Sequence, residues 1–313
     1  MASLVEGTRA RGAFLLRTVM DPPWSLRIED EAPLAVFCVL NGQAWLTLDG
    51  GSPVLVQPGD VSIVCGPDHY VVSDDPETSP TIIIHPGQRC TTLTGEDLAM
   101  EMVLGVRTWG NSKHGATALV TGTYEGRSEI GRRLLDALPA LVVVRADEWD
   151  SPLVELLSRD LVRNDPGQEV VLDRLLDLLL IAVVRAWFAR EEVKAPRWWR
   201  AQGDPVVGKA LRRVYSEPAY PWTVGSLAAA AGVSRAAFAR RFSELVGEPP
   251  IAYLTSWRLA LAADLLRDER KTIGAVAREV GYSSPYALST AFKRLHGISP
   301  NQHRLSMTAS PSE

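Results

Sequence analysis

The stretch VGSLAAAAGVSRAAFARRF, residues 224–242, returns about fifty residues later as IGAVAREVGYSSPYALSTAF, residues 273–292. Each copy opens with apolar residues spaced i, i+3, i+4, i+7 and then passes through a glycine to a serine. The matched residues are Val224, Leu227, Ala228, Ala231, Gly232 and Ser234, and then Ile273, Val276, Ala277, Val280, Gly281 and Ser284. The spacing predicts a short helix with one buried stripe, the glycine predicts a left-handed turn, and the serine caps a second helix. Each copy therefore predicts a helix-turn-helix unit.

The two copies also end alike. After each serine the apolar pattern resumes and closes at a glycine and a proline, which are Gly247 and Pro250 in the first copy and Gly297 and Pro300 in the second. A single match on so short a pattern would fit a plain helical hairpin equally well. Because the pattern is duplicated with glycine, serine and proline at matching positions, we favour the helix-turn-helix interpretation.

One long helix is expected between the two copies. Residues 251–266 have apolar side chains at helical spacing, and they lie between Pro249-Pro250 and Asp268. Such a helix would hold the two units at a fixed separation. Because the second helix of each unit enters the major groove, two of them on one face would suit groove segments roughly 34 Å apart. A single subunit is therefore expected to bind a bipartite DNA site.

Residues 206–304 carry further motifs. They are Ala-Ala-Gly-Val-Ser at 230–234, Gly-Glu-Pro-Pro-Ile-Ala-Tyr-Leu at 247–254, Arg258, Val-Gly-Tyr-Ser-Ser at 280–284, Ala-Phe-Lys-Arg at 291–294, and the ending from Gly297 to Arg304. With these motifs the region resembles regulators of the AraC/XylS family. The resemblance implies transcriptional control by promoter binding, often by an activator that contacts RNA polymerase, with a partner domain that receives the signal. It implies no catalysis.

The expected DNA contacts follow from position on the two recognition helices. They are Arg235, Ala236, Ala239, Arg240, Arg241, Tyr286, Ser289, Thr290, Lys293 and Arg294. Arg240 is the expected base contact, worth about 1–3 kcal/mol if bidentate to guanine, and the other basic residues are expected on phosphates. A solvated helix face is the alternative for any one arginine. Many relatives carry arginine at the position of Thr290, so the second unit is expected to read sequence weakly.

Charge divides the chain in the same way. Residues 204–313 contain 14 Lys and Arg against 9 Asp and Glu, a net of +5, whereas the remaining 19 basic and 28 acidic residues give −9. The overall charge of −4 therefore hides a basic module joined to an acidic one. Only the basic module has the electrostatics for binding phosphates and releasing counterions.

The first 125 residues contain short apolar or alternating runs separated by turn residues. The runs are 13–20, 24–28, 34–40, 44–48, 54–56, 61–65 and 70–72. Short strands with close turns predict an antiparallel β-barrel or double-sheet roll with an interior pocket. Together with the helical remainder, this predicts an α+β multidomain protein.

Two short motifs resemble the cupin fold. Pro58-Gly59-Asp60 and Gly66-Pro67-Asp68-His69 are similar to the second cupin motif, and Leu40-Asn41-Gly42 is similar to the turn after the first. Cupins commonly serve as sensors in AraC-type regulators. Metal-binding cupins place a histidine pair and a glutamate where this chain has Phe37-Cys38-Val39. An enzymatic metal site is therefore not expected, and no cofactor is expected.

The input that the cupin-like domain senses has several alternatives. The residues expected to contact a small-molecule effector are Trp24, Phe37, Cys38, Trp45 and His69, although aromatic residues on short strands also simply fill a core. The first alternative is a redox or soft-metal sensor that uses Cys38, Cys65, Cys90 and His69, with Arg89 lowering the pKa of the Cys90 thiol. The others are a cupin metalloenzyme tethered to DNA and an architectural protein without an input.

The middle of the chain is expected to be helical. Residues 152–161 and 169–190 have helical period, and their apolar stripe is expected to dock on the barrel or to form a homodimer. The expected division is 1–145 for the sensor, 146–191 for the dimerisation segment, 192–204 for a linker, 205–305 for DNA binding and 306–313 for a flexible tail.

Several features together favour a cytoplasmic protein that does not interact with membranes. The longest apolar run in the leucine-rich middle, residues 178–184, is too short to span a bilayer. The three cysteines form no zinc-type spacing, and no secretion signal opens the chain. The chain is therefore expected to be a cytoplasmic, sequence-specific transcription regulator.

Overall fold

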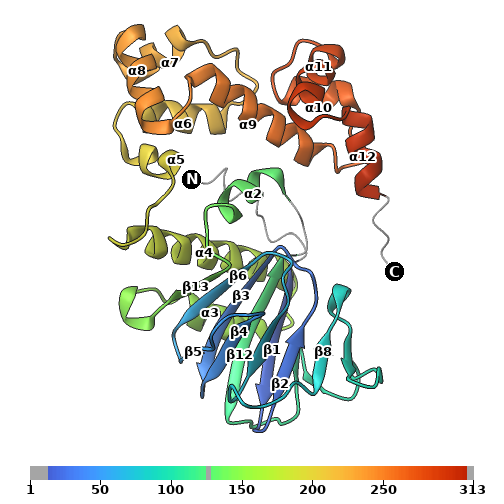
Figure 1. Ribbon diagram of the computed structural model, residues 1–313. Helices are drawn as coiled ribbons and strands as arrows, with labels where there is room; N and C mark the ends of the chain where they lie inside the picture. The colour runs from blue at the N-terminus through green and yellow to red at the C-terminus, as the bar shows by residue number, and fades with distance from the viewer. Residues whose placement is uncertain (1–12, 125–127, 309–313) are drawn as a thin grey trace. The chain divides into compact units, whose positions relative to one another are not determined.

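The computed structural model describes residues 13–124 and 128–308 (Figure 1). Contacts divide the chain into two compact units. Among the described residues, the first contains 13–124 and 138–193 and is called the sensor unit after its expected role, and the second contains 128–137 and 194–308 and is called the DNA-binding unit. Each unit has its own hydrophobic core within the described residues.

Two β-sheets make up most of the sensor unit. The strands are β1 (Phe14–Met20), β2 (Ser25–Ile28), β3 (Leu34–Asn41), β4 (Ala44–Leu48), β5 (Val54–Val56), β6 (Val61–Cys65), β7 (Tyr70–Ser73), β8 (Ile82–Ile84), β9 (Cys90–Thr92), β10 (Val103–Gly105), β11 (Thr108–Gly110), β12 (Thr117–Tyr124) and β13 (Leu141–Val144). One sheet has the order β10-β11-β1-β12-β3-β6-β13 and the other the order β5-β4-β7-β2-β8-β9. The double-sheet form is one of the two that the sequence predicted.

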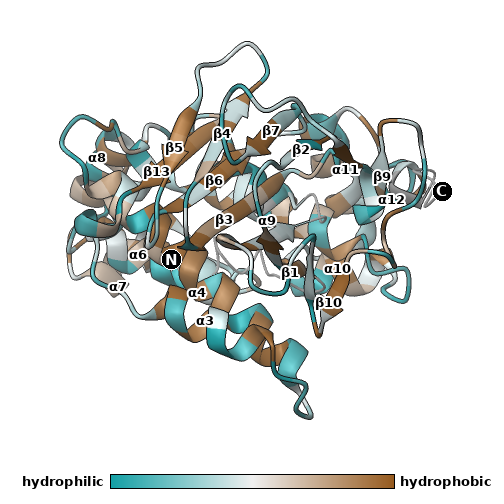
Figure 2. Cartoon of the chain, turned by 90° about the horizontal axis from the view of Figure 1, so that it is seen from below, coloured by the Kyte–Doolittle hydropathy of each residue, from teal (hydrophilic) through white to brown (hydrophobic). Residues whose placement is uncertain are grey.

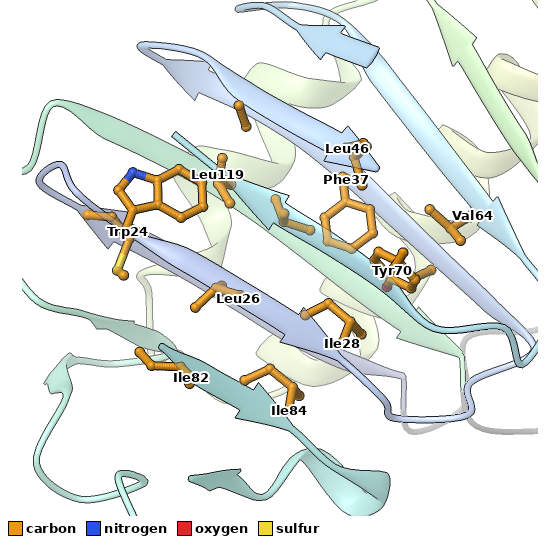
Figure 3. Packing of buried hydrophobic residues seen from close by; sticks show 14 of the residues in the cluster. Trp24, Leu26, Ile28, Phe37, Leu46, Val64, Tyr70, Ile82, Ile84 and Leu119 are labelled. Atoms are coloured by element: carbon orange, nitrogen blue, oxygen red, sulfur yellow. The ribbon is translucent and has the colours of Figure 1, made fainter. Parts of the chain in front are cut away.

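The core of the sensor unit lies between the two sheets. Figure 3 shows Leu26 and Tyr70 from one sheet packed with Phe37, Val64 and Leu119 from the other. Strand β3 is apolar without alternation because one face lies in this core and the other packs on a helix. All seven strands predicted from the sequence are confirmed, whereas β8 to β13 were not predicted.

Helices α3 (Leu153–Leu161) and α4 (Gln168–Ala189) pack on the outer face of the first sheet. Their predicted helical periods are confirmed, and Figure 2 shows the banding of hydrophobic and hydrophilic residues along both. Gly122 in β12 allows the close approach of α4, since a Cβ at this position would lie 2.7 Å from Leu176 Cδ1. Leu176 is fully buried there.

The DNA-binding unit is helical. Its helices are α2 (Glu129–Leu135), α5 (Arg197–Arg200), the short 3-10 helix η3 (Ala201–Gly203), α6 (Val207–Ser216), α7 (Val224–Ala231), α8 (Arg235–Val246), α9 (Pro250–Leu265), α10 (Ile273–Glu279), α11 (Pro285–His296) and α12 (Pro300–Thr308). The long helix α9 contributes to two cores. Tyr253 and Trp257 pack in the core around α7 and α8, whereas Leu259 and Ala263 pack in the core around α10 and α11.

Three segments of the chain differ from the division that the sequence predicted. Residues 128–137, expected in the sensor, group with the DNA-binding unit. The expected linker 192–204 contains α5 and η3, and Ala201 there is buried in the first core. The expected tail begins in helix, because α12 continues to Thr308, and residues 309–313 lie outside the described part of the chain.

Candidate DNA-binding surface

The first helix-turn-helix unit is built by local capping. Thr223 and Ser226 form a reciprocal capping box at the start of α7, in which the Ser226 backbone N donates to Thr223 Oγ1 at 3.0 Å. Gly232 has φ +75 in the turn, a left-handed conformation that favours glycine. Ser234 Oγ then accepts a hydrogen bond from the Ala237 backbone N at 3.3 Å, and α8 begins. The predicted turn and cap are confirmed.

The second unit repeats this construction. Ser284 Oγ accepts from the Ala287 backbone N at 3.1 Å, and Pro285 takes the first position of α11, where no backbone donor is needed. Gly281 has φ +82, and a Cβ there would lie 2.7 Å from Arg258 Nη2 and 2.8 Å from the Ala219 carbonyl oxygen. The glycine therefore allows the left-handed turn and also the close approach of Arg258 and of the Ala219 carbonyl group.

The inner faces of the two recognition helices are fully buried. Phe238 and Phe242 anchor α8, and Leu288 and Phe292 anchor α11. The predicted contact residues occupy the remaining faces. Exposed side chains are Arg235, Ala236, Arg240, Arg241, Tyr286, Thr290, Lys293 and Arg294, and partly buried ones are Ala239 and Ser289. The structure therefore leaves most of the predicted contacts open to a ligand.

Arg240 and Arg241 have different surroundings. The side chain of Arg240 is 77% exposed, and its Nε lies 3.9 Å from Glu244 Oε1, which is a weak surface ion pair. Arg241 instead binds Asp204, with Nη2 to Oδ2 at 2.5 Å and Nε to Oδ1 at 3.1 Å. The hydrogen bond from Arg241 lowers the pKa of Asp204 to about 2. Arg240 is therefore freer to reach DNA.

Two further arginines of the AraC-like motifs hold the helices together. Arg258 on α9 donates from Nε to the Pro218 carbonyl oxygen at 2.8 Å and from Nη2 to that of Tyr220 at 2.7 Å. Arg304 on α12 donates to the carbonyl oxygens of Leu266 and Lys271. Both satisfy carbonyl groups near loops, so their contribution is to the scaffold.

A cavity of about 50 Å³ lies between the sheets of the sensor unit. Phe37 and Tyr70 line it and meet edge to face, with ring centroids 5.8 Å apart. Trp109 also lines it, and its buried Nε1 has no hydrogen-bond partner among the described residues. Asp30 is the charged residue of the lining. The cavity is therefore largely apolar, with one unused donor.

Comparison with known proteins identifies the family. Residues 1–189 match the Cupin family, and residues 227–306 match the helix-turn-helix domain family. A putative AraC-like transcription regulator of Streptomyces lividans is 30% identical, and the match covers 90% of each chain. The chain belongs to the AraC family of transcriptional regulators.

Two other proteins illustrate the extent of the similarity. The HTH-type transcriptional regulator AlkR of Acinetobacter baylyi is 31% identical to this regulator over 90% of each chain. The DNA-binding domain of AdpA, solved in complex with a target DNA, is 32% identical, and the match covers 36% of the regulator and 100% of that chain with a TM-score of 0.33. The two family matches show that the regulator has a helix-turn-helix DNA-binding domain and a cupin-like domain.

Of the five residues expected to contact an effector, the structure brings Phe37 to the cavity. Trp24 is buried in the same core but does not line the cavity, and Cys38 is buried on the opposite face of β3. Trp45 is partly buried on β4 and lies outside the lining. The side chain of His69 is 39% exposed, with Nδ1 3.8 Å from Glu29 Oε1. Strand register separates these residues, and it could not be read from composition.

The thiols of the regulator are in apolar surroundings. Burial raises the pKa of Cys38 and of Cys65 to about 12 and that of Cys90 to about 11, where nearby Asp97 adds to the effect. The predicted lowering of the Cys90 pKa by Arg89 is wrong, because desolvation disfavours the thiolate. Residues 13–124 and 128–308 contain no group of three or more His, Cys, Asp or Glu placed to hold a metal.

Helix α4 is the longest of the helices in residues 13–124 and 128–308. None of the helices that the structure describes is both long and apolar enough to cross a membrane.

Proposed function

We propose that the regulator binds a bipartite promoter sequence through α8 and α11, with Arg240 as the principal base contact. The observation that carries this proposal is that both recognition helices are anchored to α9 by buried aromatic residues, while their outer faces are exposed. Arg240 can present a guanidinium to guanine, whereas Ala236 and Ala239 leave room for its approach.

The two units are proposed to contribute unequally. Thr290 on α11 has one short hydroxyl and cannot make a bidentate contact with guanine. Lys293 and Arg294 are exposed, and neither forms an ion pair among the described residues. We assign them to phosphates, which position the protein without specifying sequence. Tyr286 is 82% exposed and is assigned to the same interface.

The cavity of the sensor unit is the proposed effector site. Its lining is mainly apolar, includes the carboxylate of Asp30, and among the described residues includes no cationic side chain. A neutral, mainly apolar molecule with an acceptor for Trp109 Nε1 would satisfy it, because a buried unpaired donor costs free energy. Binding would shift the population of conformations that differ in DNA affinity.

Four further assignments belong to this proposal. The regulator acts in the cytoplasm as a homodimer, contacts RNA polymerase at the promoter and is not an enzyme. Exposed apolar residues on α4, Val171 at 45% and Leu178 at 50%, lie seven positions apart on one helix face and support the dimer. The regulator names of the relatives support the other three.

The test compares binding to a duplex selected from the regulator's upstream DNA with binding to a scrambled duplex over a salt series. Specific complexes exceed non-specific ones by at least roughly a thousandfold. Arg240→Ala should reduce that preference by roughly 5- to 150-fold, the equivalent of about 1–3 kcal/mol. The control is Arg270→Ala, since the Arg270 side chain is 90% exposed outside the recognition helices.

A lack of sequence preference in the wild-type protein is the contrary outcome. One result is equal binding of the selected and the scrambled duplex by the wild-type protein, and the other is a selection from fragments of the whole genome that yields no preferred sequence. These two results together would contradict the proposal. The DNA-binding unit would then only tether the cupin-like domain, and the tethered-enzyme alternative would gain support. Arg270→Ala should behave like wild type in either case.

A further inference from the structure

Helix α2 belongs to one unit by chain order and to the other by packing. It follows β12 and precedes β13, and both of these strands belong to the first sheet of the sensor unit. Residues 128–137 nevertheless group with the DNA-binding unit, where α2 packs on α9. Figure 1 shows α2 below α9, whereas α8 and α11 lie above it. Most of the predicted contact residues on the outer faces of α8 and α11 are exposed, so the contact leaves these faces open.

The first turn of α2 is held by a carboxylate of α9. Asp264 Oδ2 accepts a hydrogen bond from Ser128 Oγ at 2.7 Å, and Asp264 Oδ1 accepts one from the Glu129 backbone N at 2.7 Å. Ser128 Oγ in turn accepts from the Gly131 backbone N at 3.1 Å. One residue of α9 thus satisfies the beginning of a helix that is more than a hundred positions away in the chain. Hydrogen bonds to a charged acceptor are stronger than neutral ones.

The other end of α2 contacts the opposite half of α9. Arg133 Nη2 donates to Ser256 Oγ, and the guanidinium carbon lies 5.5 Å from the centre of the Tyr253 ring. Leu134 is 2% exposed. The two sets of contacts are eleven positions apart on α9, from Tyr253 to Asp264, so they span most of the helix that carries both helix-turn-helix units.

The strand that leads into α2 forms part of the cavity wall. Leu119, Thr121 and Thr123 of β12 line the cavity, and the chain passes from Thr123 to Ser128 within five positions. On the other face of β12, Gly122 meets Leu176 of α4. The element at the cavity, β12, and the element attached to α9, α2, are therefore consecutive along the chain.

We propose that α2 is the coupling element of the regulator and that its docking on α9 links the state of the cavity to DNA binding. The inference rests on the proposed function, because it needs a DNA site and a sensing cavity. Coupling between two sites is reciprocal in binding free energy. DNA bound at α8 and α11 therefore changes the stability of β12, provided that α2 is attached.

The test is hydrogen exchange of the full-length protein with and without saturating selected duplex. In the wild type, the duplex changes exchange in α2 and in β12, whereas the scrambled duplex does not. Asp264→Ala removes the acceptor of two hydrogen bonds and should reduce the DNA-induced change in β12 at least about fivefold, the lower range of allosteric couplings. A purely structural role for Asp264 would lower stability without removing this DNA-dependent response.

Matched variants complete the experiment. Arg133→Gln breaks the other end of the contact, leaves Asp264 in place and should lose the same response. Arg132→Ala changes an arginine of α2 whose ion pair, with Glu129, lies within α2, and Glu269→Ala removes an exposed carboxylate just beyond α9. Both should respond like wild type.

Two results would overturn the inference while leaving the proposed function intact. One is an unchanged β12 response in Asp264→Ala and Arg133→Gln. The other is a wild-type protein that prefers the selected duplex but shows no response in β12. A wild-type protein without preference between the duplexes overturns the proposed function, and the coupling with it.

Discussion

The ion-pair partner of Arg241 changes the role that is expected for this residue. It lies on recognition helix α8, where a contact with a DNA phosphate is predicted from the sequence, but its guanidinium binds Asp204, which lies just before α6. Asp204 Oδ1 also accepts hydrogen bonds from the backbone N of Val206 and of Val207. Asp204 thus satisfies two backbone donors at the beginning of α6 and pairs with Arg241, so it connects the beginning of α6 to α8.

The Asp204 pair predicts a pH-dependent stability. Hydrogen bonding by Arg241 depresses the folded-state pKa of Asp204 to about 2. A depressed carboxylate pKa stabilises the fold above the unfolded-state pKa, near 3.9, and the stabilisation is lost as the pH falls toward 2. We expect Asp204→Asn to be less stable than wild type above about pH 5, with the difference shrinking at lower pH.

Urea unfolding of both proteins between neutral pH and the lowest pH that keeps the fold would measure this difference. Arg241→Ala should show the same pH dependence as Asp204→Asn, since it removes the other partner. A stability difference that is independent of pH would contradict the ion pair.

At the scale of elements, β12 is a strand of the sensor unit that is held on both edges and both faces. It pairs with β1 and β3, lines the cavity on one face and contacts α4 on the other. Helix α9 is its counterpart in the DNA-binding unit, because it contributes to two cores. A helix that is apolar on more than one face gives a poorly defined amphipathic pattern. The existence of α9 could be predicted from the sequence, but the division of its apolar residues between two cores could not.

A methyl group at Gly122 tests the packing of β12 on α4. Gly122→Ala places a Cβ 2.7 Å from Leu176 Cδ1, and overpacking of this kind costs about 1–3 kcal/mol. We expect the free energy of unfolding of the sensor unit to fall by that amount, as measured by denaturant unfolding. Gly105→Ala in β10 is the control, since a Cβ there would be 3.9 Å from its nearest neighbour, Thr108 Cβ, which is an ordinary contact. Equal stability of both variants would contradict the close approach.

At the scale of the whole molecule, the acidic sensor and the basic DNA-binding module of the sequence correspond to two compact units. Within the described part of the sequence, the chain passes between them on each side of α2 and again at residue 194, which makes three connections. A chain that crosses between its units more than once can transmit a change through more than one connection. The coupling proposed for α2 uses the two connections on either side of this helix.

The proposed dimer is tested at this scale by a charge on α4. Leu178→Glu puts a carboxylate on the exposed apolar face and should convert dimer to monomer in sedimentation velocity at micromolar concentration. Buried unpaired charge at an interface is strongly unfavourable. Leu93→Glu is the matched control, because Leu93 is 63% exposed in the same unit but lies outside α4. If both variants remain dimeric, the dimer uses another surface.

The sequence by itself determined the features that depend on neighbours in the chain. Helix period, serine caps and glycine turns are local, so both helix-turn-helix units, α3, α4 and the first seven strands were predicted. The tertiary structure decided what depends on residues far apart. The partner of Arg241, the raised pKa of Cys90, the lining of the cavity and the docking of α2 on Asp264 all arise from strand register and burial. These are set by the free energy of packing the whole fold, and no short window of sequence contains them.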